Sequence, residues 1–396
     1  MTLRKSFLQH VAQTSDAPLG IEASHAEGVY IYTRDGKKLV DLISGISVSS
    51  LGHSHPKIVA AVQEQAAKYM HLMVYGEFVE QPQVLLAEKL CSLLPENLNS
   101  VYFTNSGTEA TEGALKLAKR YTGRSELVYF KHSYHGSTMG ALSVLGDEYF
   151  KSNYRPLIPD CTMLNYNDES DLSRISSRTA AVILEPVQAE SGITVPSKAY
   201  LKKLQQRCND LGVVLIIDEI QTGMGRTGTM FRIDKEDIQP DILLLAKAFG
   251  GGMPLGAFIS SKEKMTAFQD EPFLGHITTF GGHPVSCAAA LSSLHILCDD
   301  NQALVRGVEQ KGALFEALLV HPKILKIQRA GLMMSLAFDS YETNKRIIDR
   351  CIELGVISDW FLFNSHSLRV APPLIISEEQ IRFACSVILK SIDEVG

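Results

Sequence analysis

The chain has 396 residues, of which 45% are apolar and 21% are charged, as in ordinary globular proteins. Its net charge is −6, from 38 basic and 44 acidic residues, and this balance argues against a nucleic-acid partner. No apolar run is long enough to span a membrane, and the N-terminal residues lack the apolar core of a signal peptide. We therefore expect a cytoplasmic protein with no membrane partner and with more than one domain.

The seven cysteines are odd in number and widely scattered, without the paired spacing of a metal site or a disulfide framework. Two histidine-containing stretches, HSHP at 53–56 and YH at 134–135, have no carboxylate or cysteine at ligand spacing. We expect reduced thiols and no metal site.

Residues 28–42 predict two strands that face each other across an Arg-Asp-Gly turn. From about residue 55 the pattern changes to amphipathic helices that alternate with short apolar strands. This alternation indicates a mostly parallel sheet with helices on both faces. The expected strands lie at 100–103, 126–130, 180–186, 213–219 and 241–247, and the expected helices at 55–70, 81–95, 108–123 and 197–212.

After about residue 290 the chain is helical again and then gives strands near 332–338 and 367–373. This tail is typical of an α+β lobe, which could share a sheet with the N-terminal strands. We therefore expect a large domain over 51–290 and a smaller domain built from 1–50 and 291–396.

Small polar residues follow the strand at 100–103, where a helix is expected to begin. In an open parallel sheet, ligands bind beyond the carboxyl ends of the strands. Backbone N–H groups at a helix start bind phosphate, and here Ser106 and Thr108 add hydroxyl donors beside Gly107. The alternative is an ordinary helix cap by Ser106 or Thr108, which this stretch alone favours.

Three further strands end in residues of unusual chemistry. Asp218 closes an apolar strand, where a buried carboxylate needs a cation or a hydrogen-bond donor. Its side chain either caps a helix or pairs with an arginine, or it faces a protonated ring nitrogen of a ligand. Lys247 ends a leucine-rich strand just before three glycines, and desolvation there favours the neutral, nucleophilic amine. Tyr134 follows another strand, where its ring could cover a planar ligand.

A phosphate cradle, a ring-nitrogen carboxylate, an aromatic cover and an amine nucleophile together predict pyridoxal 5′-phosphate (PLP) as the cofactor. Lys247 would then form a Schiff base with it, and the glycines would let the backbone turn tightly beside it. The stretch GMGRTG at 223–228 matches a dinucleotide fingerprint, but it does not directly follow its strand and a poor helix comes after it. We therefore do not expect a dinucleotide site.

Along nearly its whole length, from GVYIYTRDGKKLVDL at 28–42 to RVAPPL at 369–374, the chain resembles the class III (subgroup II) aminotransferases of the acetylornithine and ornithine type. The shared motifs are FTNSGTEATEGALKLAK, SYHGST, EPVQAESG, DEIQTGMGRTG, AKAFGGGMPLGA and TTFGGHP. The resemblance implies an α/β protein of fold type I, with a mostly parallel sheet covered by helices and a smaller α+β domain from both termini.

The resemblance also implies roles for individual residues. Lys247 would be the Schiff-base lysine and proton carrier, Asp218 would hold the pyridinium proton, and Gln221 would contact the ring hydroxyl. Tyr134 would stack on the ring. The implied cofactor-binding set is Ser106, Gly107, Thr108, Tyr134, His135, Asp218, Gln221, Lys247 and Thr279, with Thr279 reaching the phosphate in the neighbouring subunit of a homodimer.

For substrates, the resemblance implies that Arg369 grips the α-carboxylate of glutamate or 2-oxoglutarate by bidentate pairing. Glu190 would pair with this arginine when an ω-amine substrate enters. The chain departs from the family pattern at Ser137, where an arginine is usual, at His283, where asparagine is usual, and at Asp16, where ornithine-specific members have an aromatic residue.

We therefore expect an aminotransferase that moves an amino group from an ω-amino or amino-acid donor, acetylornithine-like foremost, to a 2-oxo acid such as 2-oxoglutarate. Pyruvate is the alternative acceptor, because a second carboxylate anchor is missing at Ser137. Two other hypotheses are a PLP-dependent aminomutase, epimerase or decarboxylase, which would need no external 2-oxo acid, and a non-catalytic protein that only holds the cofactor.

Overall fold

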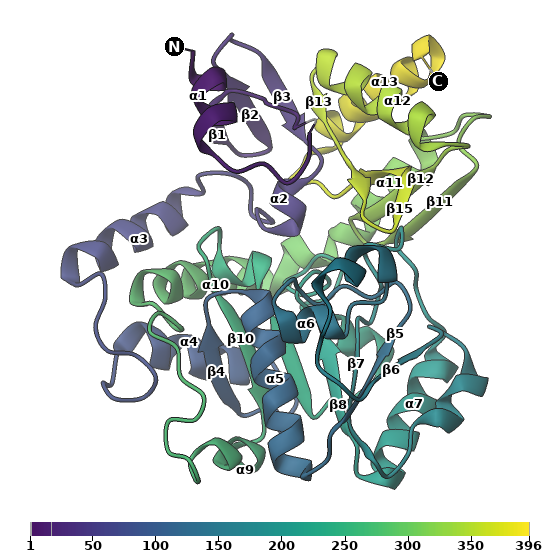
Figure 1. The fold of residues 1–396 in the computed structure, drawn as a ribbon. Coiled ribbons are helices and arrows are strands. Elements are labelled where there is room, and N and C mark those ends of the chain that lie inside the picture. The colour runs from purple at the N-terminus through teal and green to yellow at the C-terminus, as the bar shows by residue number, and fades with distance from the viewer. Residues whose placement is uncertain (1, 17, 396) are drawn as a thin grey trace.

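The computed structural model describes residues 2–16 and 18–395, and a seven-stranded sheet covered by helices forms its larger part (Figure 1). The strand order is β4-β10-β9-β8-β7-β5-β6. These strands are β4 (Ser100–Thr104), β5 (Glu126–Phe130), β6 (Cys161–Leu164), β7 (Thr179–Leu184), β8 (Val214–Asp218), β9 (Ile242–Leu245) and β10 (Gly256–Ser260).

All five strands expected for this sheet are formed, and the sheet is mostly parallel as predicted. Two strands, β6 and β10, were not expected. β10 runs antiparallel to both of its neighbours, β4 and β9. It directly follows a glycine- and proline-containing turn and itself begins with a glycine, so its sequence favours a loop.

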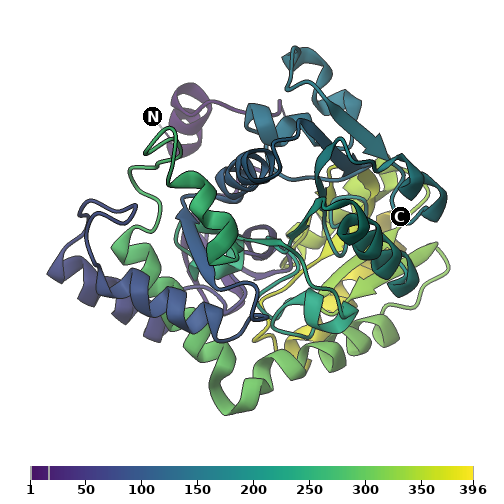
Figure 2. The same cartoon turned by 90° about the horizontal axis from the view of Figure 1, so that it is seen from below.

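Both faces of the sheet are buried, because alternate residues of each strand pack into different clusters. In β8, Val214 and Ile216 face α5 (Gly107–Thr122), whereas Leu215 and Ile217 belong to the other cluster. Helices α3 (Pro56–Lys68), α4 (Gln81–Cys91) and α10 (Pro284–Arg306) pack together on one flank (Figure 2). The remaining helices of this part are α6 (Met139–Ser143), α7 (Lys198–Leu211), α8 (Arg232–Glu236) and α9 (Lys262–Met265), with short 3₁₀ turns at Glu148–Phe150, Ser152–Tyr154, Glu169–Arg174, Lys247–Gly250 and Thr266–Phe268.

The smaller part combines both ends of the chain, as expected. Strand β13 of the C-terminal region pairs in parallel with β3 of the N-terminal region, which completes the sheet β1-β2-β3-β13. A second sheet has the order β11-β12-β15-β14. These strands are β1 (Ala23–Glu27), β2 (Tyr30–Thr33), β3 (Lys38–Asp41), β11 (Lys326–Ala330), β12 (Met333–Ala337), β13 (Val356–Ile357), β14 (Trp360–Phe361) and β15 (Asn364–Val370), and the helices are α1 (Leu3–His10), α2 (Ser44–Ser47), α11 (Val308–Leu318), α12 (Tyr341–Glu353) and α13 (Glu378–Val395). The exact domain boundaries, at 50/51 and 290/291, stay a prediction.

A buried arginine connects the two parts. Arg226, in a large-domain loop, is fully buried and donates to the carbonyl oxygens of Leu332 and Pro372 and to the hydroxyl of Ser50. Burial lowers the pKa of its guanidinium to about 9, against the opposing charge of Asp41. The same side chain therefore holds both chain segments of the smaller domain against the sheet. Over the described residues, no helix is long and apolar enough to cross a membrane.

Candidate active site

A cavity of about 510 Å³ lies beyond the ends of β4, β5, β8 and β9. It is where the position rule for open parallel sheets expects a ligand. Eight of the residues predicted from the sequence line it together, namely Ser106, Gly107, Thr108, Tyr134, His135, Asp218, Gln221 and Lys247. The other lining residues are Val48, Asn105, Gly136, Ser137, Glu185, Ile220, Ala246, Gly252, Met253, Pro254 and Leu255.

Lys247 follows β9 in an unusual backbone conformation. Its φ is +49°, in the left-handed region that few side chains occupy, and such strain is typical of functional positions. The amine donates to Gln221 Oε1 at 2.9 Å. Burial lowers the pKa of the amine, although the charge of Glu190 opposes this effect. The neutral amine is thus more accessible than on a surface lysine.

Asp218 is a buried carboxylate on the cavity wall. Its Oδ2 lies 2.6 Å from His135 Nδ1, and its Oδ1 accepts from the backbone N–H of Ile220 at 3.0 Å. The other ring nitrogen of His135, Nε2, is buried without a hydrogen-bond partner among the described residues. His135 therefore stands beside the carboxylate and fixes its orientation.

The N-terminus of α5 forms one end of the cavity. Ser106 is the N-cap of this helix and accepts from the N–H of Glu109 at 3.3 Å, so the capping alternative is also correct. Side chains pack closely around two glycines at this helix start. A Cβ at Gly107 would lie 2.9 Å from Ile220 Cδ1, and one at Gly136 would lie 2.3 Å from Thr108 Oγ1. A larger residue at either position would collide with a side chain beside the helix start, where an anion can bind.

Glu185 is a cavity residue to which the sequence assigned no role. Its two oxygens accept from the backbone N–H groups of Tyr134 at 3.0 Å and Ala189 at 3.1 Å. Burial raises the pKa of this carboxyl to about 7. Glu185 thus ties the loop of Tyr134 to the loop of Glu190. Glu185 is the first residue of the motif EPVQAESG, but a sequence pattern cannot show that its carboxylate joins these two loops.

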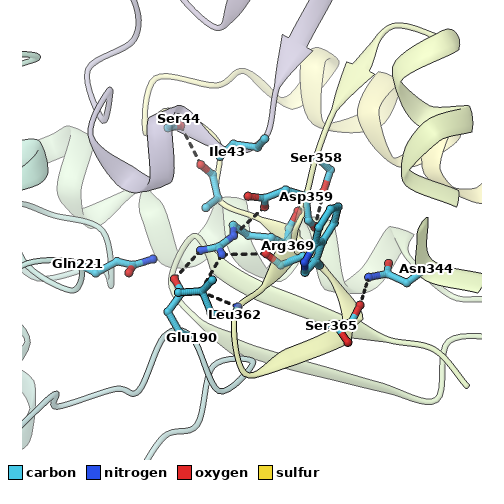
Figure 3. A network of polar contacts seen from close by, with 12 residues as sticks. Ile43, Ser44, Glu190, Gln221, Asn344, Ser358, Asp359, Leu362, Ser365 and Arg369 are labelled. Carbon is cyan, nitrogen blue, oxygen red and sulfur yellow. Dashed lines mark hydrogen bonds and ion pairs between the residues drawn. The ribbon is translucent and has the colours of Figure 1, made fainter. Parts of the chain in front are cut away.

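Arg369 and Glu190 form a buried bidentate ion pair close to the cavity (Figure 3). The two N···O distances are 3.1 and 3.0 Å. Burial alone would raise the pKa of Glu190, but Arg369 outweighs it and lowers the pKa. A second carboxylate, Asp359, binds Arg369 Nε at 2.8 Å and was not predicted. Gln221 lies on the large-domain side of this pair in Figure 3.

Thr279 is exposed and lies outside the cavity. Its neighbour Thr278 accepts from Asn105 Nδ2 at 3.0 Å. The loop that carries Thr278 and Thr279 therefore lies beside the N-terminus of α5. The contribution of Thr279 to a neighbouring subunit stays a prediction. In the part of the chain that the structure describes, no cluster of histidine, cysteine or acidic residues is arranged to hold a metal ion.

The family model described as aminotransferase class-III matches residues 11–392. The chain belongs to the class-III aminotransferases. The chain is 36% identical to an acetylornithine aminotransferase from Methanopyrus kandleri, over 93% of this chain and 94% of that one. Its identity to an acetylornithine aminotransferase from Clostridium acetobutylicum is also 36%, over 92% and 95% of the two chains.

Solved structures agree with this membership. An ornithine aminotransferase from Toxoplasma gondii, with partial occupancy of PLP at its active site, superposes with a TM-score of 0.91 at 29% identity and covers 99% of this chain and 93% of its own. An adenosylmethionine-8-amino-7-oxononanoate aminotransferase from Methanocaldococcus jannaschii has a TM-score of 0.92 at 28% identity, with 99% of each chain covered.

This class-III aminotransferase is a PLP-dependent enzyme that transfers amino groups, as predicted. The aminomutase, epimerase and decarboxylase alternatives are not favoured by these relatives. The cavity fits the cofactor chemically. It places an amine, a buried carboxylate and a glycine-lined helix start around one space. When bound, PLP supplies an aldehyde for an amine and a ring that accepts the electron pair of a broken Cα–H bond.

Proposed function

We propose that this aminotransferase takes the amino group of an ω-amino or acylated diamino donor, acetylornithine-like foremost, and passes it to 2-oxoglutarate. The observation that carries the proposal is the Arg369–Glu190 ion pair beside Lys247. The names of the relatives from M. kandleri and C. acetobutylicum support the choice of donor.

The residues around the cofactor have separate tasks in this proposal. Lys247 would hold PLP through its amine, which burial favours in the neutral, nucleophilic form, and would carry a proton to and from the substrate carbon. Asp218, oriented by His135, would hold a proton on the cofactor's ring nitrogen, and Gln221 would bind its ring hydroxyl. Tyr134 would cover the ring face.

The N-terminus of α5 holds the phosphate in this proposal. Ser106, Gly107 and Thr108 offer backbone N–H groups and hydroxyls at the open helix start. The Thr108 hydroxyl lies 2.7 Å from Thr138 Oγ1, whereas the Ser106 hydroxyl oxygen accepts from Glu109 N–H and keeps its own hydrogen to donate. The backbone N–H groups and the Ser106 hydroxyl are therefore the main phosphate donors in this proposal.

The ion pair lets one site accept two kinds of substrate. While Glu190 covers Arg369, the positive charge is compensated, and an ω-amino donor, whose reacting carbon bears no carboxylate, enters without leaving the arginine unpaired. When glutamate or 2-oxoglutarate binds, its α-carboxylate takes the place of the Glu190 carboxylate on the same two guanidinium nitrogens. The state of the Arg369–Glu190 pair thus decides which of the two kinds of substrate is recognised.

A second candidate acceptor is pyruvate, which needs no second carboxylate anchor. Ser137 is exposed, and its hydroxyl lies 3.1 Å from the hydroxyl of Tyr134. Lys247 is the only lysine or arginine among the described residues that line the cavity. Because Lys247 is assigned to the cofactor, the γ-carboxylate of 2-oxoglutarate has no other lysine or arginine to pair with in the cavity of one chain.

We also propose a homodimer with active sites at the interface, in which Thr279 reaches the partner's phosphate. Exposed apolar side chains in two segments near this residue support the proposal. They are Met70, Leu72, Met73, Phe78, Val79, Phe273, Leu274, Ile277 and Phe280. The cytoplasm stays the proposed location, and the free state of all seven cysteines is in keeping with a reducing compartment.

The test is an absorbance titration of the PLP-loaded enzyme with single amines, so that only one half of the reaction can run. Acetylornithine, ornithine, 4-aminobutyrate, lysine, glutamate and alanine are added separately. Loss of the visible cofactor band with acetylornithine and with glutamate supports the proposal. A response to alanine but not to glutamate favours pyruvate as the acceptor. If no ω-amine and no acylated diamine changes the spectrum, the proposed donor class is wrong.

A further inference from the structure

Arg369 is held by acids on two different edges of its guanidinium (Figure 3). Glu190 binds the edge formed by Nη1 and Nη2, at 3.1 and 3.0 Å. Asp359 binds Nε at 2.8 Å, and the carbonyl of Trp360 accepts from Nη2 at 3.1 Å. Four of the five guanidinium N–H groups are therefore used, and the two acids do not compete for the same one.

The edge bound by Glu190 has the donors that a substrate carboxylate needs. Besides the two guanidinium nitrogens, the backbone N–H of Leu362 donates to Glu190 Oε2 at 3.0 Å. The carboxylate of Glu190 thus occupies a site of three converging donors. A substrate carboxylate can use the same donors only if Arg369 stays where it is after Glu190 has moved away.

The opposite side of Arg369 has the contacts that could keep it there. The ring of Phe361 lies 4.4 Å from the guanidinium carbon, within the range of a cation–π contact. Asp359 and Trp360 precede this ring on the same strand hairpin, β14–β15. None of these three contacts is made by Glu190, and the backbone bond from Phe363 N–H to the carbonyl of Glu190 ties the same hairpin to the Glu190 loop. All three contacts can therefore remain when only the side chain of Glu190 rotates away.

We propose that Asp359 is a positioning residue for substrate carboxylates, because it fixes Arg369 through Nε and leaves the Nη1/Nη2 edge free to exchange Glu190 for a substrate. The inference rests on the proposed function of Arg369 as the α-carboxylate anchor. Asp359 also keeps a counterion on the buried guanidinium during the exchange, which avoids an unpaired buried charge. Glu190 is then the moving acid and Asp359 the fixed one.

The test compares the two half-reactions of the PLP-loaded enzyme in single turnovers, with acetylornithine as the donor probe and glutamate as the carboxylate probe. Asp359→Ala removes both the hydrogen bond and the charge. We expect the glutamate concentration for half-maximal rate to rise about tenfold or more, as for the loss of a hydrogen bond between charged groups. The acetylornithine half-reaction should change by no more than about twofold, since Glu190 still covers Arg369.

Asp359→Asn keeps the size of the side chain and one acceptor oxygen, so it should shift the glutamate reaction in the same direction by a smaller factor. If circular dichroism shows that Asp359→Ala does not fold, the asparagine variant provides the test instead. The matched control is Glu342→Gln, which removes a charge from an exposed position on α12. It should leave both half-reactions unchanged.

Two outcomes overturn the inference: an unchanged glutamate response in both Asp359 variants, or equal losses in both half-reactions, which would indicate a structural role only. Arg369→Gln separates this inference from the proposed function. If that variant reacts normally with glutamate, Arg369 is not the anchor and the proposed function fails. If it loses the glutamate reaction while the Asp359 variants keep it, only the role of Asp359 is wrong.

Discussion

Replacing Glu190 with glutamine tests the proposed exchange most directly. The glutamine has nearly the same shape, but it has no charge and only one oxygen that can face Arg369. Of the two hydrogen bonds of the ion pair, one is lost, and the other keeps its charged donor but has a neutral acceptor. Arg369 keeps Asp359 as a counterion, so the substitution does not leave an isolated buried charge.

The size of the effect follows from these contacts. A hydrogen bond to a charged group contributes about 1.5–3 kcal/mol, and the variant loses one such bond. Glutamate has to displace the residue at 190, and this displacement becomes easier by about 1.5–3 kcal/mol. Since 1.4 kcal/mol corresponds to a factor of ten, the apparent dissociation constant for glutamate should fall by roughly ten- to a hundredfold. Both side chains of the pair are almost completely buried, so solvent screening reduces this value little.

The assay is a single-turnover titration of the PLP-loaded variant with glutamate and, separately, with acetylornithine. Glutamate should saturate at lower concentration than in the wild type. Acetylornithine should react more slowly, because the uncovered Arg369 repels the substrate ammonium group and attracts its carboxylate into the wrong orientation. Glu342→Gln again serves as the control. Unchanged or weaker glutamate binding in the Glu190 variant would refute the reasoning.

Three more predictions follow from the site and its surroundings. Lys247→Ala should lose transamination by orders of magnitude, because it removes the nucleophile and the proton carrier, and turnover near the wild-type rate would contradict this assignment. Gly136→Ala should weaken PLP binding, since the added Cβ would lie 2.3 Å from Thr108 Oγ1, and dialysis against cofactor-free buffer measures the loss. Burial raises the pKa of Glu219 from its ordinary 4.5 to about 7, so its contribution to stability is complete below about pH 4.5 and is lost as the pH rises through 7. At about 1.4 kcal/mol per pH unit this is roughly 3 kcal/mol, and Glu219→Gln should flatten the fall of the melting temperature between about pH 4.5 and pH 7.

The residues at strand ends could be predicted because a parallel sheet gathers them at one edge. Asp218 and Lys247 close two neighbouring strands, and a local apolar pattern suffices to place each of them. Arg369 and Glu190 were recognised by family resemblance, and the structure brings them together across 179 positions of the sequence.

Other contacts had no such signal. Asp359 precedes a short hairpin strand whose pairing depends on a register irregularity, and no sequence pattern indicates that its side chain faces Arg369. Glu185 accepts from two backbone N–H groups, and backbone donors are the same for every residue type. Strand β10 was missed because its place beside the edge strand β4, between β4 and β9, is a tertiary property.

The tether formed by Arg226 restricts how the molecule can move. A hinge opening between the two parts would pull the guanidinium away from the carbonyls of Leu332 and Pro372 and leave a buried cation without acceptors, at a cost of several kcal/mol. Rigid-body closure of one domain over the other is therefore an expensive way to admit substrates to this enzyme. Rotation of single side chains about their own bonds needs no such rupture. Amide hydrogens next to the tether, at Leu332 and Leu374, should accordingly keep their protection from exchange when substrate binds.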